Sequence, residues 1–244
     1  MSEKADTLNG SETLGFPNHV GIILDGNRRF AKSLGLDPRK GHEYGEKKIE
    51  KLLDWCKEYG ILELTLYTFS VQNFNRPKPE FDYITKLFVQ GAKKLLNDER
   101  LEKYDIRVKF IGRTHMFSEE IQKLMKQIEE KTANNSKYKI NFAMAYGGRE
   151  EIIDGVNDLL KDVKSGKINA EKINDKTFEK YLYLNSEPDL IIRTGGEQRT
   201  SNFLPWQSTY SEWIFLKKPW PEFEKKDFLT CLQDFSNRER RMGK

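Results

Sequence analysis

The sequence predicts an α/β fold, in which a single domain holds a mostly parallel six-stranded sheet flanked by helices. Two observations support this prediction. Short apolar or β-branched runs alternate along the chain with longer amphipathic stretches, which is the pattern of parallel strands joined by crossover helices. Two of these runs, Val20 to Leu24 and Leu190 to Ile192, lead directly into charged turns that contain glycine, as strands do at the ligand-binding edge of an open sheet.

The alternation predicts six strands in chain order. Each is a short run of aliphatic, aromatic or β-branched residues that ends in a polar segment. The expected strands are Val20 to Leu24, Glu63 to Phe69, Arg107 to Ile111, Ile140 to Ala145, Leu190 to Arg193 and Trp213 to Leu216.

Helices are expected between these strands. The stretch from Gly41 to Tyr59 carries apolar residues at steps of three and four, the spacing of a helix face that packs on a sheet. A second helix is expected at Phe81 to Leu96. Ser118 is a candidate cap for a third helix, whose first turn carries two glutamates that suit the positive end of the helix dipole. The last helix is expected from Lys226 to Arg240.

Length and composition predict one soluble domain. A chain of 244 residues is long enough for one large α/β core, and no internal repeat or low-complexity linker divides it. We expect the domain over residues 17–244 and a flexible tail over residues 1–16, which are polar and lack an apolar signal core. No apolar run approaches the ~20 residues that span a bilayer, so the expected location is cytoplasmic.

The charge and the scattered metal-binding residue types limit the function. The net charge, 42 − 38 = +4, suits an anionic ligand without requiring nucleic acid. Cys56 and Cys231 lie far apart in segments with helical spacing, which predicts buried free thiols rather than a disulfide. The three histidines are also dispersed, so we do not expect a zinc cluster.

Polar turns follow several of the predicted strands. They are Asp25 to Arg29, Ser70 to Arg76, Gly147 to Arg149 and Arg193 to Ser201, and in a parallel sheet all four would meet at one edge. Arginines beside carboxylates suit a polyanionic ligand that a divalent cation bridges. Neither a Walker A nor a GxGxxG pattern is present. The residues alone therefore indicate magnesium-assisted chemistry on a phosphorylated, partly apolar small molecule.

Five ordered motifs resemble those of one known family. The segment from His19 to Ala31, HVGIILDGNRRFA, is similar to the signature of the cis-prenyltransferases, the family of undecaprenyl and dehydrodolichyl diphosphate synthases. Agreement continues at Gly41-His42, at Tyr67 to Pro77, at Ile192 to Glu197 and at Arg199 to Leu204. The resemblance implies a butterfly-like α/β homodimer that condenses isopentenyl diphosphate onto an allylic diphosphate, adding cis isoprene units.

The resemblance also implies roles for individual residues. Asp25 and Asn73 would be catalytic, and Asp25 and Glu212 would bind Mg²⁺, with Glu212 reached from a neighbouring turn or from the partner subunit. The implied substrate-binding residues are Gly26, Asn27, Arg28, Arg29, Phe30, Arg39, His42, Ser70, Val71, Gln72, Phe74, Arg76, Arg193, Arg199, Thr200, Ser201, Arg241 and Gly243.

Some positions depart from the bacterial pattern. Arg28 stands where bacterial members more often have glycine, and Arg28 with Phe30 is closer to archaeal and eukaryotic members, which leaves farnesyl and geranylgeranyl diphosphate both open as primers. Gln198 replaces a common bacterial histidine. The implied product is a long polyprenyl diphosphate that serves as a lipid carrier for glycan synthesis, and peripheral membrane contact for its release is left open. The alternatives are a non-catalytic partner subunit of a synthase and a magnesium-dependent phosphohydrolase. A nucleic-acid binder is disfavoured, because the arginines lie at turns beside carboxylates.

Overall fold

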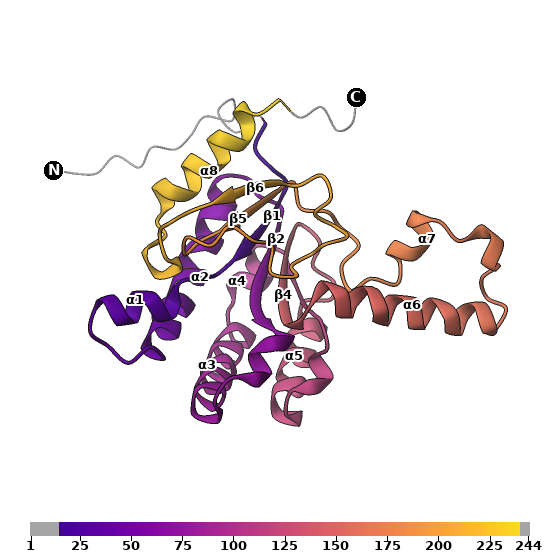
Figure 1. Cartoon of the computed structure of the whole chain (residues 1–244), viewed down its shortest axis with the longest axis horizontal. Coiled ribbons are helices and arrows are strands. Elements are labelled where there is room, and N and C mark those ends of the chain that lie inside the picture. Colours follow the sequence, from indigo (N-terminus) through magenta and orange to yellow (C-terminus); the bar gives the residue numbers. More distant parts are fainter. Residues whose placement is uncertain (1–14, 240–244) are drawn as a thin grey trace.

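A six-stranded sheet forms the centre of the protein in the computed structural model, which describes residues 15–239 (Figure 1). The strand order is β3-β4-β2-β1-β5-β6, and every neighbouring pair is parallel. The sheet is thus wholly parallel, where the sequence predicted a mostly parallel one. The strands are β1 (His19–Ile23), β2 (Glu63–Ser70), β3 (Ile106–Ile111), β4 (Tyr138–Tyr146), β5 (Leu190–Arg193) and β6 (Glu212–Phe215).

All six predicted strands are confirmed, with small differences at their ends. The register sets Ile23 of β1 beside Tyr67 of β2 and beside Arg193 of β5. Because the three strands run in the same direction, the segments that follow them begin at one edge of the sheet. The polar turns that follow the first, second and fifth strands are therefore neighbours in space.

The predicted helices are present as well, but the last one ends at Asn237, before the predicted end at Arg240, because the backbone at Arg238 is extended. The α-helices of the described residues are α1 (Asn27–Ser33), α2 (Lys40–Glu58), α3 (Lys78–Leu96), α4 (Arg100–Lys103), α5 (Glu119–Lys131), α6 (Gly148–Lys164), α7 (Asp175–Glu179) and α8 (Lys225–Asn237). The predicted helices correspond to α2, α3, α5 and α8. Ser118 occupies the N-cap position of α5 with an extended backbone, but its side chain makes no capping hydrogen bond. The predicted position of the cap is therefore correct, but the prediction that the Ser118 side chain caps the helix is wrong.

Alternate strand residues divide the core between two faces of the sheet. On one face, buried residues of α2, α5 and α8 pack with the strand residues Ile22, Leu66 and Ile192 in one continuous cluster. The opposite face carries a smaller cluster in which Ile191 packs with Phe203 of the segment between β5 and β6. Both cysteines are buried and free, as predicted.

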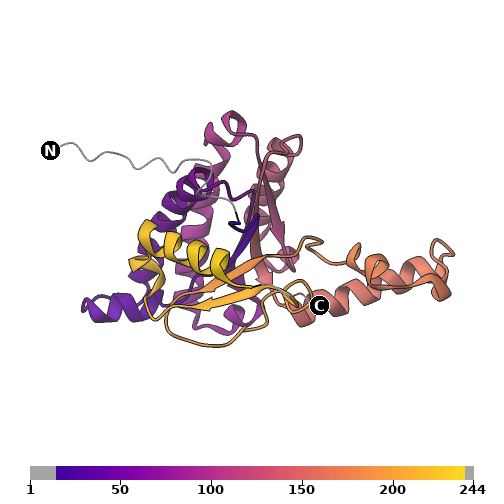
Figure 2. The same cartoon turned by 90° about the horizontal axis from the view of Figure 1, so that it is seen from above.

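Helices α6 and α7 form an arm that projects from the body of the molecule, a feature that is plain in two perpendicular views (Figures 1 and 2). Along α6, Ile153, Val156 and Leu160 are 56%, 38% and 46% exposed. Their spacing of three and four residues places them on one side of the helix. Within residues 15–239, no helix has the length and apolarity to cross a membrane.

Close contact between α1 and α2 positions the turn after β1. A Cβ atom added at Gly41 would lie 1.9 Å from the backbone oxygen of Asn27, so only glycine fits where the two helices meet. Gly26, which precedes α1, has φ +102, and a Cβ there would lie 2.7 Å from Cβ of Pro219. The Trp220 indole donates a hydrogen bond to the backbone oxygen of Gly45 at 2.8 Å. Glycines thus let three segments converge beside Asp25.

We expect Gly41→Ala to lower the free energy of unfolding by roughly 2 kcal/mol, because the added methyl group meets fixed backbone and forces α1 away from α2. Gly91→Ala on α3 is the matched control. Its Cβ would meet only the carboxylate end of Glu46, at 3.1 Å, and that side chain can move. Urea denaturation measures both variants, and equal stabilities would contradict the proposed constraint at Gly41.

Candidate active site

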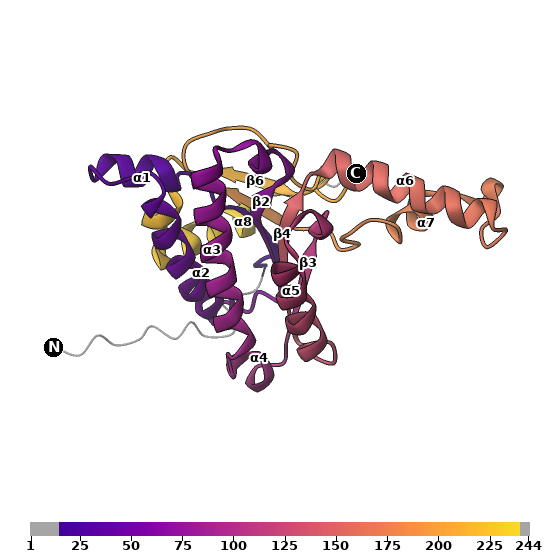
Figure 3. The same cartoon turned by 90° about the horizontal axis from the view of Figure 1, so that it is seen from below.

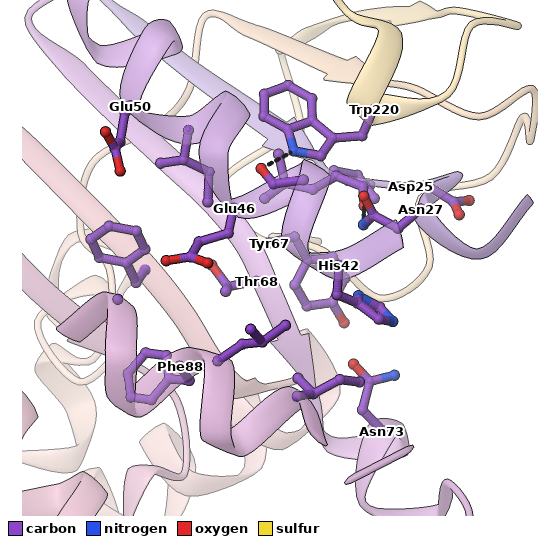
Figure 4. Close-up of a pocket in the computed structure, with 18 of the residues that line it drawn as sticks. Asp25, Asn27, His42, Glu46, Glu50, Tyr67, Thr68, Asn73, Phe88 and Trp220 are labelled. Atoms are coloured by element: carbon purple, nitrogen blue, oxygen red, sulfur yellow. Dashed lines mark hydrogen bonds between the residues drawn. The ribbon is translucent and has the colours of Figure 1, made fainter. Parts of the chain in front are cut away.

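A cavity of about 620 Å³ opens beside Asp25 and extends between α2 and α3, which lie side by side over β1 and β2 (Figure 3). Figure 4 shows Asp25, Asn27, His42 and Asn73 at one end and Glu50 and Phe88 toward the other. Polar residues surround the end that we call the mouth: Asp25, Gly26, Asn27, Arg28, Arg29, His42, Ser70, Asn73 and Arg76. The inner wall is mainly apolar and contains Ile49, Leu53, Ile84, Leu87, Phe88, Ala92, Leu95 and Phe142.

Asp25 is the centre of the polar contacts at the mouth. Its Oδ2 accepts a hydrogen bond from Nη2 of Arg193 at 2.9 Å, and its Oδ1 lies 3.1 Å from Nη2 of Arg29. Oδ1 also accepts a bond from the Gly26 backbone nitrogen at 2.6 Å. The hydroxyl of Thr194 donates to the backbone oxygen of Asp25 at 2.8 Å. The ends of β1 and β5 therefore hold this carboxylate from both sides.

Arg193 contacts Arg199 and Ser201, two other residues for which the family resemblance implied substrate binding. Its side chain is buried, and Nη1 donates to the hydroxyl of Ser201 at 2.6 Å and to the backbone oxygen of Arg199 at 2.5 Å. The Arg199 guanidinium itself is 62% exposed and pairs with Glu197, and Thr200 is exposed beside it. Glu197 also binds Arg29 at 3.2 Å. These residues form a basic surface on the Arg193 side of Asp25.

Glu80 organises the basic residues on the other side of the mouth. Its Oε1 lies 2.6 Å from Nη1 of Arg76, 3.7 Å from Nη1 of Arg28 and 3.9 Å from Nε2 of His42. Glu80 is not among the site residues predicted from the sequence. The available signal was its position four residues after Arg76, the spacing at which a carboxylate and a guanidinium meet on a helix.

His42 is neutral at physiological pH. Burial lowers its pKa to about 4, and the positive charges of Arg76 and Arg28 contribute in the same direction. Its Nε2 is buried and makes no hydrogen bond to any residue in the described range 15–239. A neutral imidazole with one uncommitted nitrogen at a basic cavity mouth is suited to an oxygen of an anionic ligand.

The short 3₁₀ helix η1 (Val71–Asn75) places Asn73 at the mouth. The side chains of Ser70 and Asn73 form a capping box, in which the Asn73 amide oxygen accepts a bond from the Ser70 backbone nitrogen at 2.9 Å. Both residues line the cavity. Val71 is half-buried and Gln72 is exposed.

Other predicted substrate-binding residues lie away from the cavity lining. The ring of Phe74 packs against Phe69 at 5.2 Å between centroids and belongs to an aromatic cluster. Phe30 makes an edge contact with Tyr44 at 5.2 Å. Arg39 forms an exposed ion pair with Asp37. The remaining predictions, Arg241 and Gly243, lie outside the described residues.

Glu212 is not brought to Asp25 within one protomer. It begins β6 and is paired in register with Leu190, the first residue of β5, whereas Asp25 follows the last residue of β1. Glu212 thus lies at the opposite edge of the sheet, where its Oε2 binds Nη1 of Arg238 at 2.6 Å. Among residues 15–239, no group of three or more His, Cys, Asp or Glu side chains could hold a metal ion. A metal at Asp25 would need oxygen ligands from a bound ligand.

The donor set at the mouth fits such a combination. Mg²⁺ commonly binds one or two carboxylates and completes its shell with water and substrate phosphates. Asp25 supplies one carboxylate, and the arginines on both sides supply the planar donors that suit phosphate oxygens. An anionic group held here would have its apolar part directed toward the inner wall between α2 and α3.

Comparison with known proteins agrees with this geometry. The prenyltransferase family model, described as undecaprenyl diphosphate synthase, matches residues 23–243. A tritrans,polycis-undecaprenyl-diphosphate synthase (geranylgeranyl-diphosphate specific) of Thermococcus kodakarensis is 46% identical over 93% of this chain and 87% of its own length. The enzyme of the same description from Methanocaldococcus jannaschii is 45% identical over 93% of this chain and 83% of its own length.

A solved structure extends the comparison to the fold. Lavandulyl diphosphate synthase from Lavandula x intermedia, in complex with dimethylallyl diphosphate, superposes with a TM-score of 0.88 at 33% identity. The match covers 95% of this chain and 100% of that one. The parallel sheet and its flanking helices are therefore shared with this enzyme.

The lowered pKa of His42 predicts a pH dependence of stability. Below pH 6.5 the unfolded chain takes up a proton at this residue that the folded protein does not, so stability falls as the pH decreases toward 4. From pH 6.5 to pH 5 the loss is roughly 1–2 kcal/mol for this residue alone. His42→Gln should remove that part of the pH dependence in urea denaturation. His115→Gln, at an exposed position, is the control. Parallel pH profiles for His42→Gln and the wild type would contradict the assignment.

Proposed function

The chain belongs to the undecaprenyl diphosphate synthase family of cis-prenyltransferases, and we propose that it extends geranylgeranyl diphosphate with isopentenyl diphosphate units. The product is a polyprenyl diphosphate of the undecaprenyl class, a lipid carrier for glycan synthesis. The choice of primer is supported by the names of the archaeal relatives and by the adjacent Arg28 and Arg29. The single observation that carries the proposal is a cavity with a basic mouth and an apolar interior.

Each substrate has a place in this arrangement. The allylic diphosphate binds at the mouth, held by Arg28, Arg29 and the uncommitted Nε2 of His42, and its prenyl tail lies between α2 and α3. Isopentenyl diphosphate binds on the other side of Asp25, at Arg199 and Ser201, above the buried Arg193 guanidinium. Asp25 lies between the two and directs the reacting carbons toward each other.

The chemistry follows from these positions. Cleavage of the allylic carbon–oxygen bond places negative charge on the leaving diphosphate, which the arginines stabilise. The double bond of isopentenyl diphosphate then forms the new carbon–carbon bond, and loss of a proton restores a double bond. Apolar walls exclude water from the allylic cation. Asn73 positions the group that loses the proton, and the released diphosphate is the acceptor, because an amide is a poor base.

Mg²⁺ is the cofactor in this proposal. Asp25 would hold it together with diphosphate oxygens, and it would supply charge neutralisation for the leaving group. Glu212 would act in a neighbouring site only from a partner subunit, since within its own protomer it lies at the far edge of the sheet.

A homodimer forms part of the proposal. The exposed apolar side of the projecting helix α6 (Ile153, Val156 and Leu160) offers a surface for a second copy. The RxG sequence at Arg241 to Gly243 is proposed to reach the partner's diphosphate site.

Incorporation of labelled isopentenyl diphosphate with Mg²⁺ tests the activity, with farnesyl and geranylgeranyl diphosphate offered separately. We expect long products, with geranylgeranyl diphosphate as the better primer. Asp25→Asn should lower turnover about 100-fold or more, since it removes the charge at the centre of the site. Asp82→Asn, which alters an exposed pair with Lys78, should leave turnover unchanged.

The same assay separates the alternatives. A folded protein that incorporates no isopentenyl unit would favour the non-catalytic partner subunit. Release of phosphate from simple esters without any isoprenoid would favour the phosphohydrolase. Either result would overturn the proposed activity.

For the dimer, we expect the double variant Ile153→Glu/Leu160→Glu to be monomeric in light scattering coupled to size exclusion, because two charges would be buried at the interface. Lys161→Glu, at a 76% exposed position on the same helix, should remain dimeric and serves as the control. A double variant that stays dimeric would place the interface elsewhere.

A further inference from the structure

Charged side chains interrupt the apolar wall of the cavity. Glu46 and Glu50 of α2 and Lys94 of α3 all line it, at positions between the mouth and the deeper residues Leu53 and Leu95. Glu46 lies one helical turn beyond His42, and Glu50 lies one turn further. The mechanism proposed above uses none of these three residues.

Glu46 reaches across the space between the two helices. A Cβ atom placed on Gly91 of α3 would lie 3.1 Å from Oε1 of Glu46, so the carboxylate rests against the opposite helix. Figure 4 shows it between the mouth and Phe88. Within residues 15–239 it makes no hydrogen bond and no ion pair. Burial raises its pKa, and the nearby Glu50 and Glu43 act in the same direction, whereas Lys94 and Lys47 oppose it.

The neighbouring lysine is already engaged. Nζ of Lys94 lies 2.5 Å from Oε1 of Glu50, which neutralises that pair. Glu46 is therefore the unpaired member of the group. Beyond it Leu53 and Leu95, together with the ion pair of Asp98 and Arg100, also border a second cavity of about 50 Å³.

We propose that Glu46 is a specificity-determining residue that limits how tightly the cavity holds a prenyl chain. This inference rests on the proposed function, in which every allylic substrate places its diphosphate at the mouth and its tail between α2 and α3. The tail then displaces water from an unpaired carboxylate, and that loss of hydration offsets part of the gain from burying the chain. A cavity that holds the chain less tightly releases a long product more readily.

Equilibrium binding of two ligands, geranylgeranyl diphosphate and inorganic pyrophosphate, tests this role without turnover. Pyrophosphate occupies only the mouth, so the ratio of the two dissociation constants reports on the tail. In Glu46→Leu we expect geranylgeranyl diphosphate to bind roughly tenfold more tightly, a factor that corresponds to about 1.4 kcal/mol. The affinity for pyrophosphate should not change.

Two further variants separate charge from shape and from folding. Glu46→Gln keeps the size of the side chain and removes the charge, and it should also bind geranylgeranyl diphosphate more tightly than the wild type. Glu58→Gln makes the same charge change on α2, at a position that pairs with Lys225 outside the cavity, and it should bind both ligands as the wild type does. Both Glu46 variants should be at least as stable as the wild type, because an unpaired carboxylate is removed.

Three results would overturn the inference: an unchanged ratio of dissociation constants in both Glu46 variants, a parallel change in pyrophosphate affinity, or an equal effect of Glu58→Gln. Failure of the proposed function has a different signature, since the wild type would then incorporate no isopentenyl diphosphate. In steady-state assays, Glu46→Leu should have a lower KM for the primer and slower product release, with an unchanged single-turnover rate of condensation.

Discussion

The site depends on the buried guanidinium of Arg193, whose charge must be compensated where water has little access. The residue is 3% exposed, and its side-chain partners are Asp25 after β1, the hydroxyl of Ser201 and the backbone oxygen of Arg199. One cation therefore joins the end of β1 to the loop after β5. The carboxylate that we propose as catalytic is also a structural partner, so we expect the removal of Asp25 to affect both the reaction and the packing of the two segments.

The parallel sheet makes this arrangement available, and glycines make it compact. Strands that run in one direction deliver their following turns to one edge, and Gly26 and Gly41 allow those turns to approach closely. The α2 helix then leads away from this edge, so that a single element presents His42 at the mouth and Leu53 deeper inside. The same helix therefore contributes a polar side chain at the mouth of the cavity and an apolar side chain to its inner wall.

Much of this could be predicted from the sequence. The six strands follow from short apolar runs that alternate with amphipathic stretches, and the proximity of Asp25 and Arg193 follows from two of these runs that end in charged turns. Glu80 and Glu46 could not be found in that way, because an acidic residue in an amphipathic helix usually faces solvent and only the packing of α2 against α3 shows otherwise. For Phe74 the sequence predicted a substrate contact, because the residue lies within one of the family motifs, but its ring packs in an aromatic cluster. Glu212 begins its strand, and that position alone places it at the edge opposite Asp25.

The carboxylates around the mouth explain how so many arginines can lie together before a ligand binds. Glu80 holds Arg76 and faces Arg28, while Glu197 is shared by Arg29 and Arg199. The exposed pairs of Glu197 contribute about 0–1 kcal/mol each, whereas phosphate oxygens offer arginine two charge-assisted hydrogen bonds at once. In the proposed function, a diphosphate would therefore displace Glu197 at small cost and find the Arg29 and Arg199 guanidinium groups already nearby. In the proposed reaction, Glu197 would recover both arginines when diphosphate leaves, which would favour release after each condensation.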